Sequence, residues 1–308
     1  MKFKFEKWHG CQNDFILLRM TSTQVVTAFQ SLKRQAPSLC SKEGDGIAAD
    51  GLLLLEYENF HDPLPKKIFI INKDGSLAAH CGNGLRCAFL SVQADYCQKC
   101  PSDEVPKELC LQVESGEEVV AHLRSAPNPT RASYLSLDMG FVDLSPSWAR
   151  DFENKTKKLL NDASFEYSEL RSASLSNRHS FVFTSKPSSK ALVKLSEVLS
   201  PLLKDYDLNI HLVAELSPTI DERKKASELL GAEPSEFYEA FSFERGVGET
   251  RACGSGASTL AALILSDDLI DRDHWLAVRM PGGFLYLRQR DSDSSVTLLG
   301  PAQRVFEG

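Results

Sequence analysis

Hydrophobic and polar positions along the chain fall mostly into short alternating or continuous apolar runs, the pattern typical of β-strands. Clear cases are 51–57 (GLLLLEY), 67–72 (KIFIIN) and 237–243 (FYEAFSF), each next to polar or glycine-containing segments. The late segments WLAVRM, FLYLRQ and VTLLG repeat this style, and the last of them can return to the first half of the chain. Many short strands with few helices predict an α+β protein rather than alternating βαβ units.

Helical spacing of apolar residues predicts two surface helices. Thr21 or Ser22 can cap a helix that runs to Gln35. Its apolar face would carry Val25, Val26 and Phe29. A second amphipathic helix is predicted over 191–203, with an interruption near Pro201 because proline removes a helical hydrogen bond.

One short motif occurs twice, and the rest of the chain is organised around it. Cys81-Gly-Asn-Gly and Cys253-Gly-Ser-Gly each precede a helical segment, the first amphipathic and the second almost wholly apolar. A polar residue stands nine positions before each cysteine, Asn72 in the first copy and Glu244 in the second. The duplication suggests two related halves, each contributing one thiol to a shared site.

Each of these cysteines is expected just ahead of a helix N-terminus. The free N–H groups and the positive end of the helix dipole there favour an anion, either a thiolate or a ligand carboxylate. A free cysteine is more often a small buried hydrophobe, and glycine before a helix is common punctuation. Neither of these interpretations explains why the motif is duplicated.

Composition and charge exclude several classes of protein. The 308 residues carry a formal net charge of −7 without a basic cluster, which argues against a nucleic-acid partner. The N-terminus lacks a signal-peptide core and no apolar run is long enough to span a bilayer, so we expect a cytoplasmic protein without a membrane partner. Eight cysteines in a chain of this length do not predict a disulfide framework. Cys97 and Cys100 form only half a zinc motif, and we expect no metal.

The length of the chain suits two domains. The proline- and serine-containing segment 125–131 (SAPNPTR) is suited to a crossing between them. We therefore predict an N-terminal domain over 1–130, completed by a last strand within about 294–308, and a C-terminal domain over 131–293.

The order and spacing of several motifs resemble diaminopimelate epimerase over nearly the whole chain. These motifs are HGCQNDF, GDGIAADG, INKDGS, CGNGLRC, NRH, an isolated Asn209, ERGVGET and CGSGA. The resemblance implies two pseudo-symmetric domains, each a mostly antiparallel β-sheet or barrel wrapped round a central helix, with the active site in the interdomain cleft. It also implies interconversion of LL- and meso-diaminopimelate without pyridoxal phosphate or another cofactor, in the synthesis of lysine and peptidoglycan precursors, by a homodimer.

The expected chemistry agrees with the duplicated motif. Inversion of an α-carbon needs a base on one face and an acid on the other, and a thiolate–thiol pair that titrates as one coupled unit supplies both. Charge developing on the α-carboxylate would be received by the backbone N–H groups of Gly82, Asn83, Gly254 and Ser255. By resemblance, Cys81 and Cys253 are the acid/base residues, tuned by His179 and Glu244. The resemblance assigns the binding of the substrate's amino and carboxylate groups to Asn13, Asn72, Asn177, Asn209, Glu244 and Arg245.

Two positions depart from the family pattern and leave alternatives open. Gly51 stands where the family often has glutamine, and Arg178 replaces the proline of Asn-Pro-His, so recognition of the far end of the substrate is expected to be looser. A racemase of another amino acid such as glutamate or proline, or one of broader specificity, keeps the same mechanism. A non-enzymatic amino-acid or anion binding module and a Cys–His hydrolase remain as alternatives, although neither needs the second matched cysteine.

Overall fold

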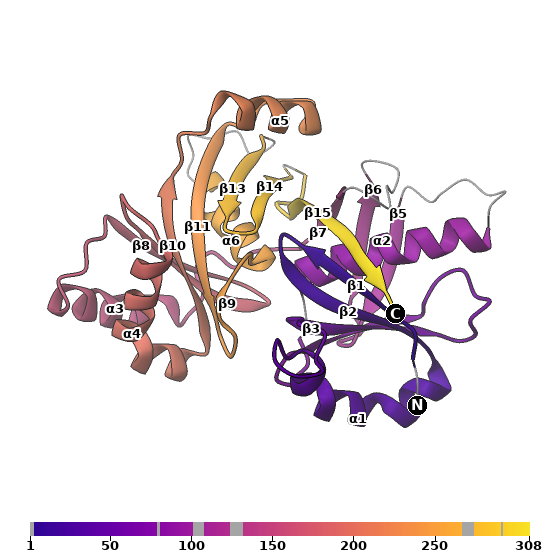
Figure 1. Ribbon diagram of the computed structural model, residues 1–308. Coiled ribbons are helices and arrows are strands. Elements are labelled where there is room, and N and C mark those ends of the chain that lie inside the picture. Colours follow the sequence, from indigo (N-terminus) through magenta and orange to yellow (C-terminus); the bar gives the residue numbers. More distant parts are fainter. Residues whose placement is uncertain (1–2, 79–80, 101–107, 124–131, 267–273, 291) are drawn as a thin grey trace. The chain divides into compact units, whose positions relative to one another are not determined.

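The chain folds into two compact units (Figure 1). The computed structural model describes residues 3–78, 81–100, 108–123, 132–266, 274–290 and 292–308. One unit comprises 1–138 with 299–308, and the other comprises 139–298. The crossing predicted at 125–131 lies outside the described residues. The division falls after Asp138, so the strand over 133–138, which the sequence analysis placed in the second domain, belongs to the first unit.

The first unit is an eight-stranded closed barrel. Its strands follow one another in the order β1 to β7 and then β15, which pairs with β1 and closes the ring. They are β1 (Phe5–Gly10), β2 (Asn13–Thr21), β3 (Gly51–Tyr57), β4 (Lys67–Asn72), β5 (Glu108–Val113), β6 (Glu118–Leu123), β7 (Ser133–Asp138) and β15 (Val296–Glu307). The pairs β2–β3 and β4–β5 are parallel, and the other pairs with an assigned register are antiparallel.

Helix α2 (Gly82–Lys99) is the central helix of this barrel. It contacts β1, β2, β3 and β7, and every residue from Gly82 to Gln93 is buried. The helix was predicted correctly, but its amphipathic character was not. The barrel encloses α2, so its first three turns have no face exposed to solvent. The helix continues through Cys97 and ends at Lys99.

Helix α1 (Ser22–Leu39) packs on the outside of the same unit. Thr21 caps it, and Gln24 completes a capping box, which confirms the predicted start. The buried face consists of Val25, Ala28, Leu32 and Ala36. Val26 was wrongly placed on that face, because its side chain is 83% exposed.

The second unit repeats the arrangement around helix α6 (Gly254–Leu265). Its strands lie in the order β14, β13, β11, β10, β9, β8, and β12 pairs with β11. They are β8 (Glu169–Leu175), β9 (Asn177–Phe183), β10 (Leu208–Glu215), β11 (Glu236–Glu244), β12 (Gly248–Thr250), β13 (Leu276–Met280) and β14 (Gly283–Gln289). Helix α6 contacts β8, β9 and β14 and is buried except at Ser255, as predicted.

Three further helices lie in this unit: α3 (Ala149–Asp162), α4 (Ser189–Tyr206) and α5 (Ile220–Leu230). Helix α4 runs through Pro201 without the predicted interruption, because leucines on both sides of the proline pack into one core with α3 and β10. The α+β class, with a mostly antiparallel sheet curled round one helix in each unit, is confirmed. Among the described residues, no helix is long and apolar enough to cross a membrane.

Candidate active site

The two duplicated cysteines occupy equivalent positions, each within its own unit. Cys81 is the N-cap of α2, with φ −146° and ψ 100°, and its Sγ accepts a hydrogen bond from the N–H of Gly84 at 3.4 Å. Cys253 is the N-cap of α6, with φ −122° and ψ 103°, and its Sγ accepts from the N–H of Gly256, also at 3.4 Å. Both sulfur atoms thus lie at the positive end of a central helix.

A chain of amides connects the α2 N-terminus to the β1–β2 hairpin of the first unit. Asn83 Nδ2 donates to Asn13 Oδ1 at 3.3 Å. Asn13 Nδ2 in turn donates to the carboxylate of Asp50 at 2.9 Å, and the N–H of Asp14 binds the same oxygen at 2.8 Å. The structure therefore brings two predicted site residues together and adds Asp50, which the sequence analysis did not single out.

Arg86 is a second residue that the sequence analysis missed. Its side chain is fully buried, and it donates to Asn83 Oδ1 at 2.6 Å and to the carbonyl of Gly82 at 3.2 Å. A third bond reaches the carbonyl of Pro301 at 3.3 Å. Arg86 therefore holds the first turn of α2 in place from within the barrel.

Asn72 lies at the end of β4, directly opposite Gly51 of β3. Its side chain donates to Ser76 Oγ at 2.9 Å within the turn that follows β4. A Cβ on Gly51 would lie only 2.7 Å from the carbonyl oxygen of Ile71. Gly51, one of the two positions that depart from the family pattern, therefore has no room for a side chain unless the neighbouring backbone moves.

A buried pair of histidines marks the second unit. His179 Nδ1 lies 2.9 Å from His211 Nε2, and His211 Nδ1 lies 2.8 Å from Ser242 Oγ. One ring nitrogen of each histidine and Cys253 Sγ all lie within 4.8 Å of one another. Burial lowers the pKa of His179 to about 3, and burial followed by the neighbouring His179 lowers the pKa of His211 well below its usual value. Both rings are consequently neutral near pH 7.

Glu244 closes this cluster from the end of β11. It accepts a hydrogen bond from Thr250 Oγ1 at 2.5 Å. Burial, and then the charge of Glu244, raise the pKa of Cys253 well above 9.0. Cys253 is therefore a thiol in the structure as it stands, despite its place at a helix N-terminus.

The remaining predicted binding residues of this unit lie along its strand ends. Asn209 is buried opposite His179 in the β9–β10 register, and its Oδ1 accepts from the N–H of Arg245 at 2.9 Å. The guanidinium of Arg245 is exposed and pairs with Asp207. Asn177 begins β9 two residues before His179. These residues gather around one end of β9, β10 and β11.

Arg178, the second departure from the family pattern, is engaged with its own unit. It donates to the carbonyl of Tyr206 at 2.9 Å, and its guanidinium carbon lies 5.5 Å from the ring centroid of Trp148. Its charge is thus held over the α3–α4 side of the unit.

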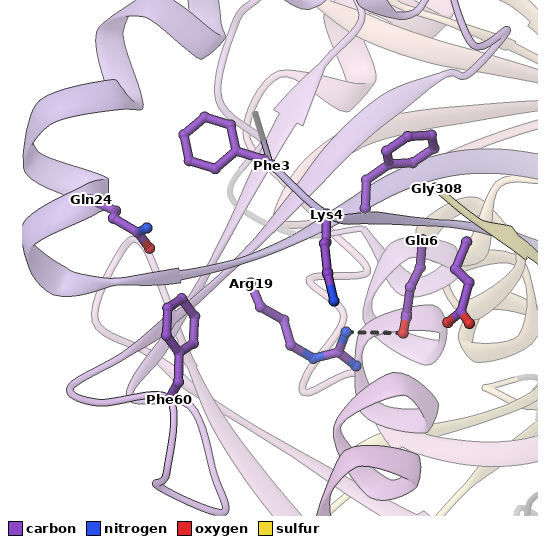
Figure 2. Close-up of a pocket in the computed structure, with 9 residues that line it drawn as sticks. Phe3, Lys4, Glu6, Arg19, Gln24, Phe60 and Gly308 are labelled. Atoms are coloured by element: carbon purple, nitrogen blue, oxygen red, sulfur yellow. Dashed lines mark hydrogen bonds and ion pairs between the residues drawn. The ribbon is translucent and has the colours of Figure 1, made fainter. Parts of the chain in front are cut away.

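Two other features of the structure could bind a ligand: a group of possible metal ligands in the second unit and a pocket in the first. Histidine and cysteine side chains are common zinc ligands, and His179, His211 and Cys253 lie close enough together to hold a metal ion, but in this structure the two histidine rings are joined to each other by a hydrogen bond. A pocket of about 720 Å³ in the first unit is lined by Phe3, Glu6, Arg19, Phe60 and neighbours (Figure 2). Its charged pair, Arg19 and Glu6, is joined at 2.9 Å, and no predicted site residue is among the described residues that line it.

Solved structures with this fold include epimerases. A structure described as a predicted epimerase from Pseudomonas aeruginosa superposes with a TM-score of 0.65 at 13% identity, covering 100% of this chain and 98% of that one. A hydroxyproline epimerase from Agrobacterium vitis, with bound trans-4-hydroxy-L-proline, gives a TM-score of 0.61 at 12% identity, covering 99% and 90%. No protein-family model matches the chain. At these identities the likeness shows the fold.

The curated relatives that match this chain are named as epimerases. The protein is therefore an isomerase of the amino-acid epimerase and racemase class. Diaminopimelate epimerase of Carboxydothermus hydrogenoformans is 29% identical over 314 residues, which cover 99% of this chain and 98% of the relative. Diaminopimelate epimerase of Nitrosomonas europaea is 27% identical over 318 residues, covering 100% and 98%. The resemblance to diaminopimelate epimerase seen in the motifs is thus confirmed along the full length of the chain.

Proposed function

We propose that this protein interconverts LL- and meso-2,6-diaminopimelate through a thiolate–thiol pair formed by Cys81 and Cys253. The observation that supports this most is the matched N-cap geometry. Each sulfur accepts a hydrogen bond from the N–H of the glycine three residues further on, at 3.4 Å in both units. The names of the curated relatives support the choice of substrate. Meso-diaminopimelate would then be supplied as a precursor of lysine and peptidoglycan.

The reaction moves one proton at each face of the α-carbon. The thiolate takes the α-proton and becomes a thiol, while the opposite thiol gives its proton to the other face and becomes a thiolate. Between these transfers the negative charge spreads onto the α-carboxylate. The backbone N–H groups of the two helix N-termini, at Gly82, Asn83, Gly254 and Ser255, are the donors that stabilise it.

The surroundings of Cys253 favour one assignment of the acid and base roles. Since burial and Glu244 keep Cys253 as a thiol, we assign it the role of acid and Cys81 that of base in the first turnover. The roles exchange when the reaction runs in the opposite direction. Asn13, Asn72, Asn177, Asn209, Glu244 and Arg245 would bind the amino and carboxylate groups of the substrate.

A different or broader amino-acid substrate is the second candidate. It is favoured by Gly51, whose lack of a side chain removes one expected contact, and by Arg178, which is directed toward Tyr206 and Trp148. Both positions affect recognition and leave the two thiols unchanged.

Proton NMR in deuterated buffer tests the proposal directly. The purified protein is incubated, without added cofactor, with LL-diaminopimelate, L-glutamate, L-lysine or trans-4-hydroxy-L-proline, and loss of the α-proton signal is followed. We expect exchange with diaminopimelate alone. Exchange with glutamate or hydroxyproline as well would support the broader enzyme, and absence of exchange with all four would overturn the two-thiol mechanism.

A further inference from the structure

His211 is a buried histidine of β10 whose two ring nitrogen atoms both take part in hydrogen bonds. In the β9–β10–β11 region (Figure 1) it lies directly opposite Ser242 and two residues beyond Asn209, the partner of His179. Its Nε2 meets His179 Nδ1 at 2.9 Å and its Nδ1 meets Ser242 Oγ at 2.8 Å. All three side chains are at most 1% exposed.

The ring of His211 is fixed on both sides. It stacks on Phe181, with ring centroids 4.7 Å apart and an interplanar angle of 18°. On another side it lies against Gly256, where a Cβ would be 2.4 Å from His211 Cε1. The ring therefore cannot turn to exchange its two nitrogen atoms without moving the first turn of α6.

Counting protons along Ser242, His211 and His179 distinguishes two arrangements. If Ser242 donates to His211 Nδ1, His211 Nε2–H donates to His179 Nδ1, and only the Nε2–H of His179 lacks a partner. If the direction is reversed, the Ser242 hydroxyl hydrogen and the Nε2 lone pair of His179 both lack partners. Ser242 Oγ has no other hydrogen-bond partner among the described residues, and His179 Nε2 has none. The first arrangement leaves fewer buried groups unsatisfied and is favoured.

We propose that His211 is a positioning residue that, together with Ser242, fixes His179 as the neutral tautomer with the proton on Nε2. His179 then places a fixed N–H donor in the buried cluster that holds Cys253 Sγ. A neutral donor stabilises the thiolate when Cys253 acts as the base, but it does not take the thiol proton. The proton of Cys253 is thereby reserved for the substrate carbon. The role assigned to Cys253 rests on the proposed function, whereas the proton arrangement does not.

The tautomers are measured by nitrogen-15 NMR of protein labelled in histidine, without substrate. We expect His179 to carry its proton on Nε2 with Nδ1 unprotonated, and His211 to show the same pattern. A proton on Nδ1 of His179 would overturn the inference. Because this measurement needs no turnover, it decides the inference even if the substrate panel shows no α-proton exchange and the proposed function fails.

Ser242→Ala tests the cause of the arrangement. Removing the hydroxyl removes the donor that sets the direction, so we expect a mixture of His179 tautomers and a roughly tenfold fall in kcat for α-proton exchange, with KM changed much less. Ser242→Thr keeps the hydroxyl and should restore both. Ser172→Ala is the matched control, since it removes another buried serine hydroxyl, bonded to Ser180 at 3.1 Å, from the same unit. An unchanged His179 tautomer in Ser242→Ala would overturn the role of the serine, and if that variant does not fold, the wild-type spectrum still decides the direction.

Discussion

The imidazole of His211 lies directly on the backbone of Gly256, the third residue of α6, so closely that a Cβ there would stand 2.4 Å from Cε1 and 2.7 Å from Nε2. The N–H of this glycine is the one that bonds Cys253 Sγ. The last glycine of the second Cys-Gly-Ser-Gly motif is thus required by a buried ring as well as by the sulfur.

Gly256→Ala should therefore force His211 and α6 apart. We expect the free energy of unfolding to fall by about 2 kcal/mol, since overpacking a close-packed interior typically costs about 1–3 kcal/mol. Urea unfolding measures the loss. Combining the substitution with His211→Ala removes the clashing ring, so the two losses should not add. Strict additivity would show that the contact is not the cause.

Cys81→Ser and Cys253→Ser should each abolish or nearly abolish α-proton exchange, by about 10²-fold or more, because each removes one acid/base group. Serine is a good N-cap, so both helices and the fold should be retained, as circular dichroism would check. Cys110→Ser, at an exposed position of β5, is the matched control. Normal turnover by either variant of the pair would contradict the two-thiol mechanism.

Stability should fall in mild acid because His179 is buried in its neutral form. Its pKa is about 3 in the folded chain against 6.5 for the ordinary side chain, so the unfolded state takes up a proton first as the pH falls. The contribution of this residue is fully present above about pH 6.5 and decreases as the pH approaches 3. Between pH 6.5 and 4.5 the loss is about 2–3 kcal/mol.

The measurement is urea unfolding of wild type and His179→Asn across this pH range. The variant should lose part of the acid sensitivity, whereas His122→Asn, which alters a histidine that folding leaves partly exposed, should not. Equal acid sensitivity in wild type and His179→Asn would contradict the assignment.

Gly51→Gln restores the residue common in the resembling family, yet it should not restore a substrate contact. The new Cβ would meet the carbonyl of Ile71 at 2.7 Å and push apart β3 and β4. We expect a destabilisation of about 1–3 kcal/mol and a higher KM, because Asn72 lies opposite this position. Thermal unfolding and substrate titration measure the two effects. A lower KM with unchanged stability would show that the barrel accommodates the longer side chain.

The sequence predicted the two N-caps because the Cys-Gly-x-Gly motif and the apolar segment after it are both local signals. It did not predict His211, since a histidine inside NIHLV looks like one more position of a strand. Its role arises only when β9 pairs in parallel with β10 and β10 with β11, which brings His179 and Ser242 to the same ring. A pairing register is not encoded in any one segment.

Arg86 was missed for a similar reason. An arginine four residues after Gly82 predicts a solvent-facing side chain on an amphipathic helix. In the structure the barrel surrounds that helix, and the guanidinium finds its partners at Gly82, Asn83 and the distant Pro301. Enclosure of α2 depends on strands that come from both ends of the chain.

The pairing of β15 with β1 has a consequence for biosynthesis. On the ribosome, the residues of the second unit emerge as one continuous stretch and have all their strands available before Leu299 is made. The barrel that holds Cys81 has to wait, with an open edge between β1 and β7, until residues 299–307 leave the exit tunnel. Domains generally fold from the N-terminus during synthesis. In this chain, however, the unit that is synthesised first is completed last. From the end of β7 until β15 is made, the nascent first unit therefore has an unpaired strand edge.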